Sequence, residues 1–236
     1  MNAQCDISAE QPFDPGADPA KLAYIGAVVR AKLDRNPAVE RIDTPHAEVY
    51  RVARFLTRRD CKEIMRVINQ CAVPSTLYRG TGIEGYRTSY THHFDRDDSL
   101  TRSIELYISD LMGMDDDHSE LMQGQRYQVG QQYKHHFDYF QVGSSYWPEE
   151  ARKGGQRTWT AMICLHEARE GGETDFPHLE KRFKPLTGEM LLWNNMRPDG
   201  TPNPKTLHAG MPVTKGIKHV ITKWYRQEAW RLINPA

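Results

Sequence analysis

The chain of 236 residues suits one sizeable domain that buries a full hydrophobic core. Lysine plus arginine and aspartate plus glutamate both number 31, and this balance provides no basic surface for nucleic acid or anionic membranes. No apolar run approaches the ~20 residues of a membrane span, the first residues do not resemble a secretory signal, and the four cysteines are scattered. We therefore expect a reduced, cytoplasmic protein that binds neither nucleic acid nor membranes.

The N-terminal half of the sequence has the patterns of a flexible segment followed by helices. Residues 1–18 contain many proline, glycine and aspartate residues, which predicts a flexible lead-in. Apolar residues then recur at helical spacing from Pro19 until Pro37 closes the segment. The same spacing predicts further helices over residues 57–69 and 100–112.

The C-terminal half has the composition of strands. Residues 158–165, 188–193 and 219–225 are predicted strands, and glycine- and proline-rich turns separate them. The polar, glycine-rich stretch 143–156 is predicted to be a mobile loop. Helices followed by short strands predict an α+β chain that ends in a β-sandwich or barrel.

Two copies of the tetrapeptide His-His-Phe-Asp, at 92–95 and 135–138, are candidates for a metal site. Residues two apart in a strand point to the same face, so His136 and Asp138 can offer an imidazole and a carboxylate to one metal. A second imidazole from a distant strand would complete the two-histidine, one-carboxylate triad of non-haem Fe(II) oxygenases. Tyrosines, glutamines and a glycine precede the second copy and indicate a strand and turn that line a pocket. Around His93 the neighbours are typical of a solvated loop, so we predict a surface histidine there.

Lys218 is a candidate partner for an anionic co-substrate. It follows His208 by ten residues across a predicted turn at Gly216, so the two residues can lie on adjacent antiparallel strands. A buried ammonium near a metal needs an anionic partner, which the carboxylate of a metal-chelating co-substrate would supply. By residue type alone, Lys218 is more often a solvated strand residue, and this alternative stays open.

Three ordered blocks carry a family resemblance. They are Tyr-x-x-Gly-Gln-x-Tyr-x-x-His-x-Asp at 127–138, Gly-Gly-Glu-Thr-x-Phe-Pro at 171–177 and His-x-Gly-x-Pro-Val-x-x-Gly-x-Lys at 208–218. Weaker blocks lie at 87–89, 154–157 and 193–200. Over roughly residues 46 to 230 the sequence resembles the Fe(II)- and 2-oxoglutarate-dependent prolyl 4-hydroxylases of the compact algal, plant and bacterial type.

The resemblance implies a role for each residue of a metal and co-substrate site. The iron ligands would be His136, Asp138 and His208. Lys218 would pair with the distal carboxylate of 2-oxoglutarate, and its hydrogen-bonding helpers would be Thr174 and Tyr127. Fe(II), 2-oxoglutarate and O2 would be required, and ascorbate is a candidate further cofactor.

The resemblance also implies which residues face a peptide. They would be Arg87, Glu120, Tyr133, Arg157 and Trp224. Two departures from the family pattern lie on this side of the site. Residues 90–93 replace the usual glycine and aromatic residue after Arg87-Thr88-Ser89, and Arg226 stands where a histidine is common in the algal type.

The implied fold is a double-stranded β-helix, or jelly roll, with N-terminal helices that buttress one sheet. His136 and Asp138 would lie near one strand end, with His208 on a facing strand. Residues 1–45 would form an N-terminal extension without a counterpart in the family, and residues 46–236 would form the dioxygenase domain. Segments 80–99 and 143–156 are candidate lids.

The implied activity is hydroxylation of prolyl residues in a peptide or protein to 4-hydroxyproline, with release of succinate and CO2. One alternative keeps the same chemistry and changes the substrate to a free amino acid or another small molecule. A second alternative is a catalytically silent metal-binding module that acts through interactions, although the complete triad with Lys218 argues against it. The sequence does not indicate the physiological substrate, the oligomeric state or the role of residues 1–45.

Overall fold

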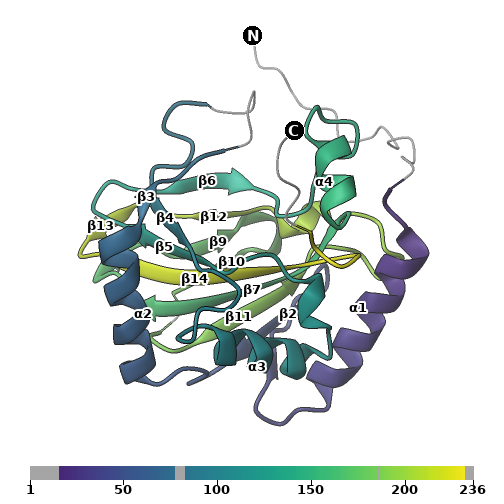
Figure 1. Ribbon diagram of the computed structural model, residues 1–236, viewed down its shortest axis with the longest axis horizontal. Coiled ribbons are helices and arrows are strands. Elements are labelled where there is room, and N and C mark those ends of the chain that lie inside the picture. The colour runs from purple at the N-terminus through teal and green to yellow at the C-terminus, as the bar shows by residue number, and fades with distance from the viewer. Residues whose placement is uncertain (1–15, 78–82, 185, 232–236) are drawn as a thin grey trace.

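The computed structural model describes residues 16–77, 83–184 and 186–231. Two antiparallel sheets lie face to face, and helices cover the outer face of the larger one (Figure 1). The larger sheet has eight strands, in spatial order β1 (Glu40–Arg41), β2 (Val49–Val52), β11 (Met190–Asn194), β7 (Arg157–His166), β14 (Lys218–Arg226), β5 (Gln123–Tyr127), β4 (Tyr90–His93) and β3 (Val73–Pro74). The smaller sheet has four, in order β10 (Lys181–Phe183), β9 (Thr174–Phe176), β12 (His208–Gly210) and β6 (Tyr133–His136). A separate pair is formed by β13 (Val213–Lys215) and β8 (Glu170–Gly171). This arrangement confirms the predicted α+β class.

Three long helices begin and end near the predicted positions. They are α1 (Pro19–Asp34), α2 (Arg58–Cys71) and α3 (Arg102–Met112). The N-terminus of α2 is capped by Thr57, whose side chain accepts from Asp60 N while the Asp60 carboxylate accepts from Thr57 N. Short helical segments are α4 (Trp147–Lys153), η1 (Asp116–His118), η2 (Pro177–Leu179) and η3 (Pro204–Thr206). Among the described residues, no helix has the length and apolar character to cross a bilayer.

The larger sheet separates two hydrophobic cores. On its outer face, Trp159 and Ile163 of β7 pack with side chains of the three long helices, including Leu33 of α1 and Ile64 of α2. Met162, the neighbour of Ile163, points to the opposite face and into the core between the two sheets. This alternation with period 2 leaves the inner faces of β5, β7 and β14 free to carry polar side chains toward the smaller sheet.

Residues 143–156 do not form one continuous loop as predicted, because α4 occupies half of this segment. Trp147 at its first position is only 2% exposed and lies against Phe140, with 6.4 Å between ring centroids. Pro148 follows in the first turn, a position where proline favours helix formation. The loop was predicted from the glycines that flank the helix. The burial of Trp147 depends on contacts with other parts of the fold, which a local composition does not show.

The candidate lid over residues 80–99 also differs from the prediction. Residues 80–82 lie outside the described part of the chain, and residues 90–93 form β4, which pairs in register with β5. His93 therefore ends a strand and does not lie in a loop, although its side chain is exposed as predicted.

Two predicted strand relationships are wrong. His208 on β12 belongs to the smaller sheet and Lys218 on β14 to the larger, so the two residues do not lie on adjacent strands. His208 and His136 are direct partners on the paired strands β12 and β6, where a facing strand was expected. The chain leaves the smaller sheet after Gly210 and forms β13, and the turn at Gly216 then leads into β14 of the larger sheet. The spacing of ten residues does not reveal this path.

Candidate active site

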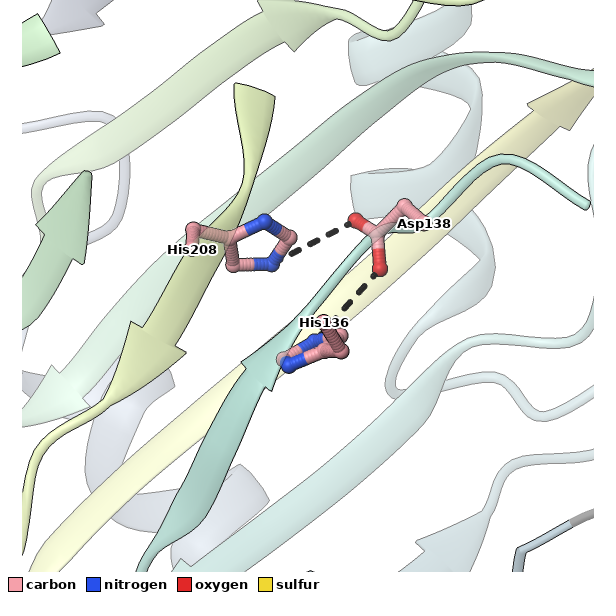
Figure 2. A group of neighbouring side chains, drawn as sticks. All are labelled: His136, Asp138 and His208. Carbon is pink, nitrogen blue, oxygen red and sulfur yellow. Dashed lines mark ion pairs between the residues drawn. The ribbon is translucent and has the colours of Figure 1, made fainter. Parts of the chain in front are cut away.

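The three predicted ligands His136, Asp138 and His208 lie together on the inner side of the smaller sheet (Figure 2). Nε2 of His136 is 3.8 Å from Asp138 Oδ1, and Nε2 of His208 is 3.8 Å from Asp138 Oδ2. One ligand atom from each residue lies within 4.8 Å of the others, close enough for a single ion to contact all three. In the described ranges, no other group of three histidine, cysteine or carboxylate side chains meets this condition.

Both imidazole rings are oriented by backbone carbonyls. His136 Nδ1 lies 2.7 Å from the carbonyl oxygen of Lys134, and His208 Nδ1 lies 3.0 Å from that of Thr206. Because a carbonyl only accepts, each Nδ1 carries the proton and each Nε2 presents its lone pair toward Asp138. Metal-binding histidines are commonly held in this way.

The protonation states match those of a metal site. Burial and the neighbouring His208 lower the pKa of His136 to about 3, so its ring is neutral at physiological pH. Burial would raise the pKa of Asp138, but the two imidazoles, Arg157 and a hydrogen bond from Thr160 outweigh it and lower this pKa. Neutral nitrogen donors and one carboxylate, with other coordination positions left open, are the ligands of non-haem Fe(II) oxygenases.

Thr160 holds the Asp138 carboxylate and is itself held by Asn195, and no sequence pattern indicated either residue. Thr160 Oγ1 donates to Asp138 Oδ2 at 2.7 Å and accepts from Asn195 Nδ2 at 2.9 Å. Thr160 lies on β7, which was correctly predicted as a strand. Because side chains alternate between the two faces of a strand, Thr160 is expected on the same face as Met162. Nothing in the sequence shows which face of that strand meets Asp138.

Lys218 and its two predicted helpers line the same cavity as the three ligands. Only 4% of Lys218 is exposed, and it forms no ion pair with any of the described residues. Burial lowers its pKa to about 8. The hydroxyl of Thr174 is buried without a hydrogen-bond partner in the described part of the chain. The Tyr127 ring centroid is 5.6 Å from Lys218 Nζ, and its hydroxyl donates to Gln125 at 3.3 Å. A buried ammonium beside an unpartnered hydroxyl is a suitable environment for a carboxylate.

The five residues predicted to face a peptide form two arginine–aromatic pairs and one carboxylate. The Arg87 guanidinium lies 4.8 Å from the Tyr133 ring centroid, and that of Arg157 lies 4.3 Å from Trp224. Tyr133 and Trp224 both line the cavity of the metal ligands. Glu120 binds Arg157 through two hydrogen bonds of 2.6 and 2.7 Å. Eight of the eleven predicted site residues thus line one cavity, while Arg87 and Arg157 lie against its aromatic side chains and Glu120 binds Arg157.

Tyr133 also contacts a metal ligand. Its ring stacks on His136 with 3.5 Å between centroids and an interplanar angle of 13°. The aromatic wall and the metal site are therefore continuous, and a substrate placed against Tyr133 lies next to the ligand set.

Comparison with known proteins agrees with this geometry. A family model described as the 2OG-Fe(II) oxygenase superfamily matches residues 122–226, a range that includes the complete triad. Probable prolyl 4-hydroxylase 10 of Arabidopsis thaliana is 32% identical over 212 residues, which cover 80% of this chain and 71% of the relative. Prolyl 4-hydroxylase 5 of the same plant is also 32% identical over 212 residues, covering 80% of this chain and 70% of the relative.

Solved structures lead to the same class. A viral collagen prolyl hydroxylase from Paramecium Bursaria Chlorella virus-1, in complex with 2OG, has a TM-score of 0.59 and 26% identity, covering 82% of this chain and 98% of that chain. A prolyl-4-hydroxylase of Pseudomonas putida, 16% identical over 86% of this chain and 98% of that chain, has a TM-score of 0.57 and shares the fold.

Fold and site together define an Fe(II)- and 2-oxoglutarate-dependent oxygenase, an enzyme whose second co-substrate is O2. Within that class, the chain belongs to the prolyl 4-hydroxylase family. The resemblance in the sequence is confirmed.

Proposed function

We propose that the protein hydroxylates prolyl residues of a peptide or protein to 4-hydroxyproline, consuming 2-oxoglutarate and O2 and releasing succinate and CO2. One observation carries the proposal beyond the family. The metal triad and Lys218 share a single cavity whose wall contains Tyr133 and Trp224, each covered by an arginine. Flat aromatic faces suit the pyrrolidine ring of proline, and the neighbouring guanidinium groups suit peptide carbonyls.

Iron is assigned to His136, Asp138 and His208, because two imidazole nitrogens and a single carboxylate fit its ligand preference. The bound metal supplies the oxidative chemistry that couples decarboxylation of 2-oxoglutarate to hydroxylation. The protein residues bind, orient and exclude water. Thr160 holds the Asp138 carboxylate, and the carbonyls behind His136 and His208 keep both Nε2 atoms directed at the metal position.

Lys218, Thr174 and Tyr127 are assigned to the distal carboxylate of 2-oxoglutarate. Lys218 is buried, and the orphaned hydroxyl of Thr174 lines the same cavity. A carboxylate at this place would pair with the buried ammonium and accept a hydrogen bond from the hydroxyl. Both the unpaired buried charge and the unpaired buried donor would then have partners. Tyr127 provides the aromatic floor under the ammonium.

The peptide is assigned to the side of the cavity formed by Tyr133 and Trp224. Arg87 donates to Thr91 and Gln123 at 3.1 and 3.3 Å, which holds its guanidinium above the Tyr133 ring. Glu120 fixes Arg157 in the same way above Trp224. These four residues with Glu120 orient the prolyl ring toward the triad.

We also infer that the two facing sheets form a double-stranded β-helix with α1, α2 and α3 as its buttress, because both sheets contribute to one inner core. The division between an N-terminal extension of residues 1–45 and a domain of residues 46–236 remains a proposal, as do a cytoplasmic location and the use of ascorbate. Three free cysteines in the described residues support a reducing environment.

The proposed function is tested with the iron-loaded protein, 2-oxoglutarate and a panel of proline-rich peptides. We expect peptide-stimulated succinate release together with a +16 Da product on a prolyl residue. Free proline and other free amino acids form the second arm, and His136→Ala serves as the inactive control. Robust turnover of a free amino acid with no response to any prolyl peptide would favour the small-molecule alternative. Absence of succinate in every arm would favour a silent metal-binding module.

A further inference from the structure

Arg226, the last residue of β14, is completely buried beside the peptide side of the site. Its guanidinium forms ion pairs with two carboxylates, at 3.0 Å from Glu120 Oε1 and in closer contact with Glu150 of α4. A third contact is a hydrogen bond of 2.7 Å to the carbonyl oxygen of Gly155. One side chain therefore connects α4, the end of β14 and the carboxylate that binds Arg157.

Arg226 and Arg157 share two partners. The first is the Glu120 carboxylate, whose Oε1 accepts from Arg157 Nε at 2.6 Å and pairs with Arg226 Nε. The second is the Phe140 ring, which lies 4.8 Å from the Arg157 guanidinium and 4.4 Å from that of Arg226. Arg157 in turn lies over Trp224, a wall of the cavity. The order Arg226, Phe140, Arg157 and Trp224 leads from the buried side of the site to its substrate wall.

The arrangement is sensitive to the shape of the buried cation as well as its charge. Glu120 has 12% of its side chain exposed and Glu150 has 5%, so both carboxylates depend on nearby cations. A planar guanidinium reaches both carboxylates and the Gly155 carbonyl while it stacks on Phe140, whereas a lysine ammonium is a single point charge. Replacement by lysine would retain the charge and lose the geometry.

We propose that Arg226 is a positioning residue for the peptide: it fixes the Arg157 guanidinium against Trp224 through Glu120 and Phe140, and it ties α4 to this part of the site. The inference rests on the proposed function for its kinetic consequence. Arg226 is assigned no contact with substrate, iron or 2-oxoglutarate, so its effect is exerted through Arg157 and Trp224.

The kinetic test compares Arg226→Lys with wild type at saturating iron. We expect the KM for a prolyl peptide to rise about tenfold, a size usual for coupled neighbouring side chains. The KM for 2-oxoglutarate and the rate of succinate release without peptide should stay within about twofold, because Lys218 and the triad do not contact Arg226. Changes of equal size in all three quantities would show a purely structural role and overturn the inference, and so would an unchanged peptide KM.

Lys223→Gln is the matched control. Lys223 lies on the same strand, is 1% exposed and pairs with Glu105 at 2.9 Å and Asp116 at 3.3 Å. It points to the opposite face of the sheet from Trp224, next to Tyr225 of the outer core. Loss of this buried pair should lower Tm and leave the peptide KM unchanged. A similar rise of the peptide KM in this variant would mean that destabilisation alone produces the effect.

Glu150→Gln is a second variant in case Arg226→Lys does not fold. It removes the anchor on α4 and leaves Arg226 and Glu120 in place, so a smaller rise in peptide KM is expected.

NMR provides a measurement that does not depend on turnover, namely the Nε–H resonance of Arg157, assigned by its loss in Arg157→Lys. Arg226→Lys or Glu150→Gln should shift this resonance and speed its solvent exchange. An unchanged resonance in both variants overturns the inference, whereas a wild-type protein that hydroxylates no peptide contradicts the proposed function alone.

Discussion

His136 and His208 are register partners on the paired strands β6 and β12, and the same kind of hydrogen bond orients both rings. Their ring centroids are 4.3 Å apart. In each case the orienting group is the carbonyl two residues earlier in the chain, which belongs to β6 for His136 and to the end of η3 for His208, so the local chain fixes the ring orientation. The two Nε2 atoms are therefore positioned before any metal arrives, which reduces the reorganisation needed on binding.

The second His-His-Phe-Asp copy should bind iron and the first should not. His136→Ala removes one of three ligands and should abolish both stoichiometric iron binding and turnover. His93→Ala should leave iron content unchanged, because His93 is exposed at the end of β4, hydrogen-bonds to Gln123 and lies outside the group of His136, Asp138 and His208. Metal analysis after desalting checks both variants, and iron retained by His136→Ala but lost by His93→Ala would reverse the assignment.

Thr160→Val should weaken iron binding even though Thr160 is not a ligand. The substitution removes the 2.7 Å hydrogen bond to Asp138 and leaves one carboxylate oxygen and the Asn195 amide without their partner. Loss of such a supporting group typically lowers metal affinity about 10- to 100-fold. Competition with a chelator measures the change. Thr158→Val is the control, since Thr158 lies on the same strand and its hydroxyl donates to the Tyr225 carbonyl, away from Asp138. An equal loss there would contradict a specific role for Thr160.

The elements that sequence predicted well are those specified locally. The helix at 57–69 combines a capping box at Thr57 with apolar residues at helical spacing, and Cys61, Ile64 and Ile68 are indeed buried. His136 and Asp138 are two residues apart, so a local rule was enough to place them together. The participation of His208 came from the family resemblance and not from spacing.

What sequence did not predict depends on contacts between distant segments. Whether β12 pairs with β14 or with β6 is decided by which sheet each strand joins, and a ten-residue separation is compatible with either. Likewise, α4 is fixed by Trp147 against Phe140 and by the pairing of Glu150 with Arg226, about 76 residues later in the chain. Neither contact leaves a periodic pattern in a short window of sequence.

Gly124→Ala should destabilise the fold. Gly124 lies on β5 beneath α2, and a Cβ there would lie 2.5 Å from Ile68 Cγ1 and 3.0 Å from the Phe94 ring. Both neighbours are fully buried, so relief requires shifts in the core at a cost of about 1–3 kcal/mol. Gly210→Ala is the control, because its nearest contact would be an ordinary 3.8 Å to Tyr133. Urea denaturation measures both, and equal stability of the two variants would contradict the close packing of α2 on β5.

Lys218→Ala should weaken 2-oxoglutarate binding and leave iron binding unchanged. Removing one partner of a buried charge pair costs about 2–5 kcal/mol, which corresponds to roughly 30- to several thousand-fold in affinity. Lys218→Arg should recover only part of this loss, because the larger, planar guanidinium group does not fit a pocket shaped around a lysine ammonium. The apparent KM for 2-oxoglutarate at saturating iron and peptide is the measurement. An unchanged value would mean that Lys218 does not bind the carboxylate of 2-oxoglutarate.

The affinity for 2-oxoglutarate should also fall as pH rises above 8. In the absence of co-substrate, burial lowers the pKa of Lys218 to about 8, opposed by the weaker influence of Cys164 and Glu173. A bound carboxylate favours the ammonium and raises this pKa, so binding above pH 8 takes up a proton. Affinity should then fall by up to about tenfold per pH unit, and stay nearly constant below pH 7.

Two other ionisable side chains near Lys218, those of Cys164 and Tyr127, do not titrate in this window. Burial raises the pKa of Cys164 to about 12 and that of Tyr127 above its usual value, so both stay protonated between pH 7 and 9.5. Calorimetry of 2-oxoglutarate binding to the metal-loaded protein without O2, between pH 7 and 9.5, gives the affinity and the number of protons taken up. Lys218→Arg is the control, because its guanidinium stays charged throughout and its affinity should not change with pH. A wild-type affinity as flat as that of the variant would mean that the Lys218 ammonium is already fully protonated at pH 9.5.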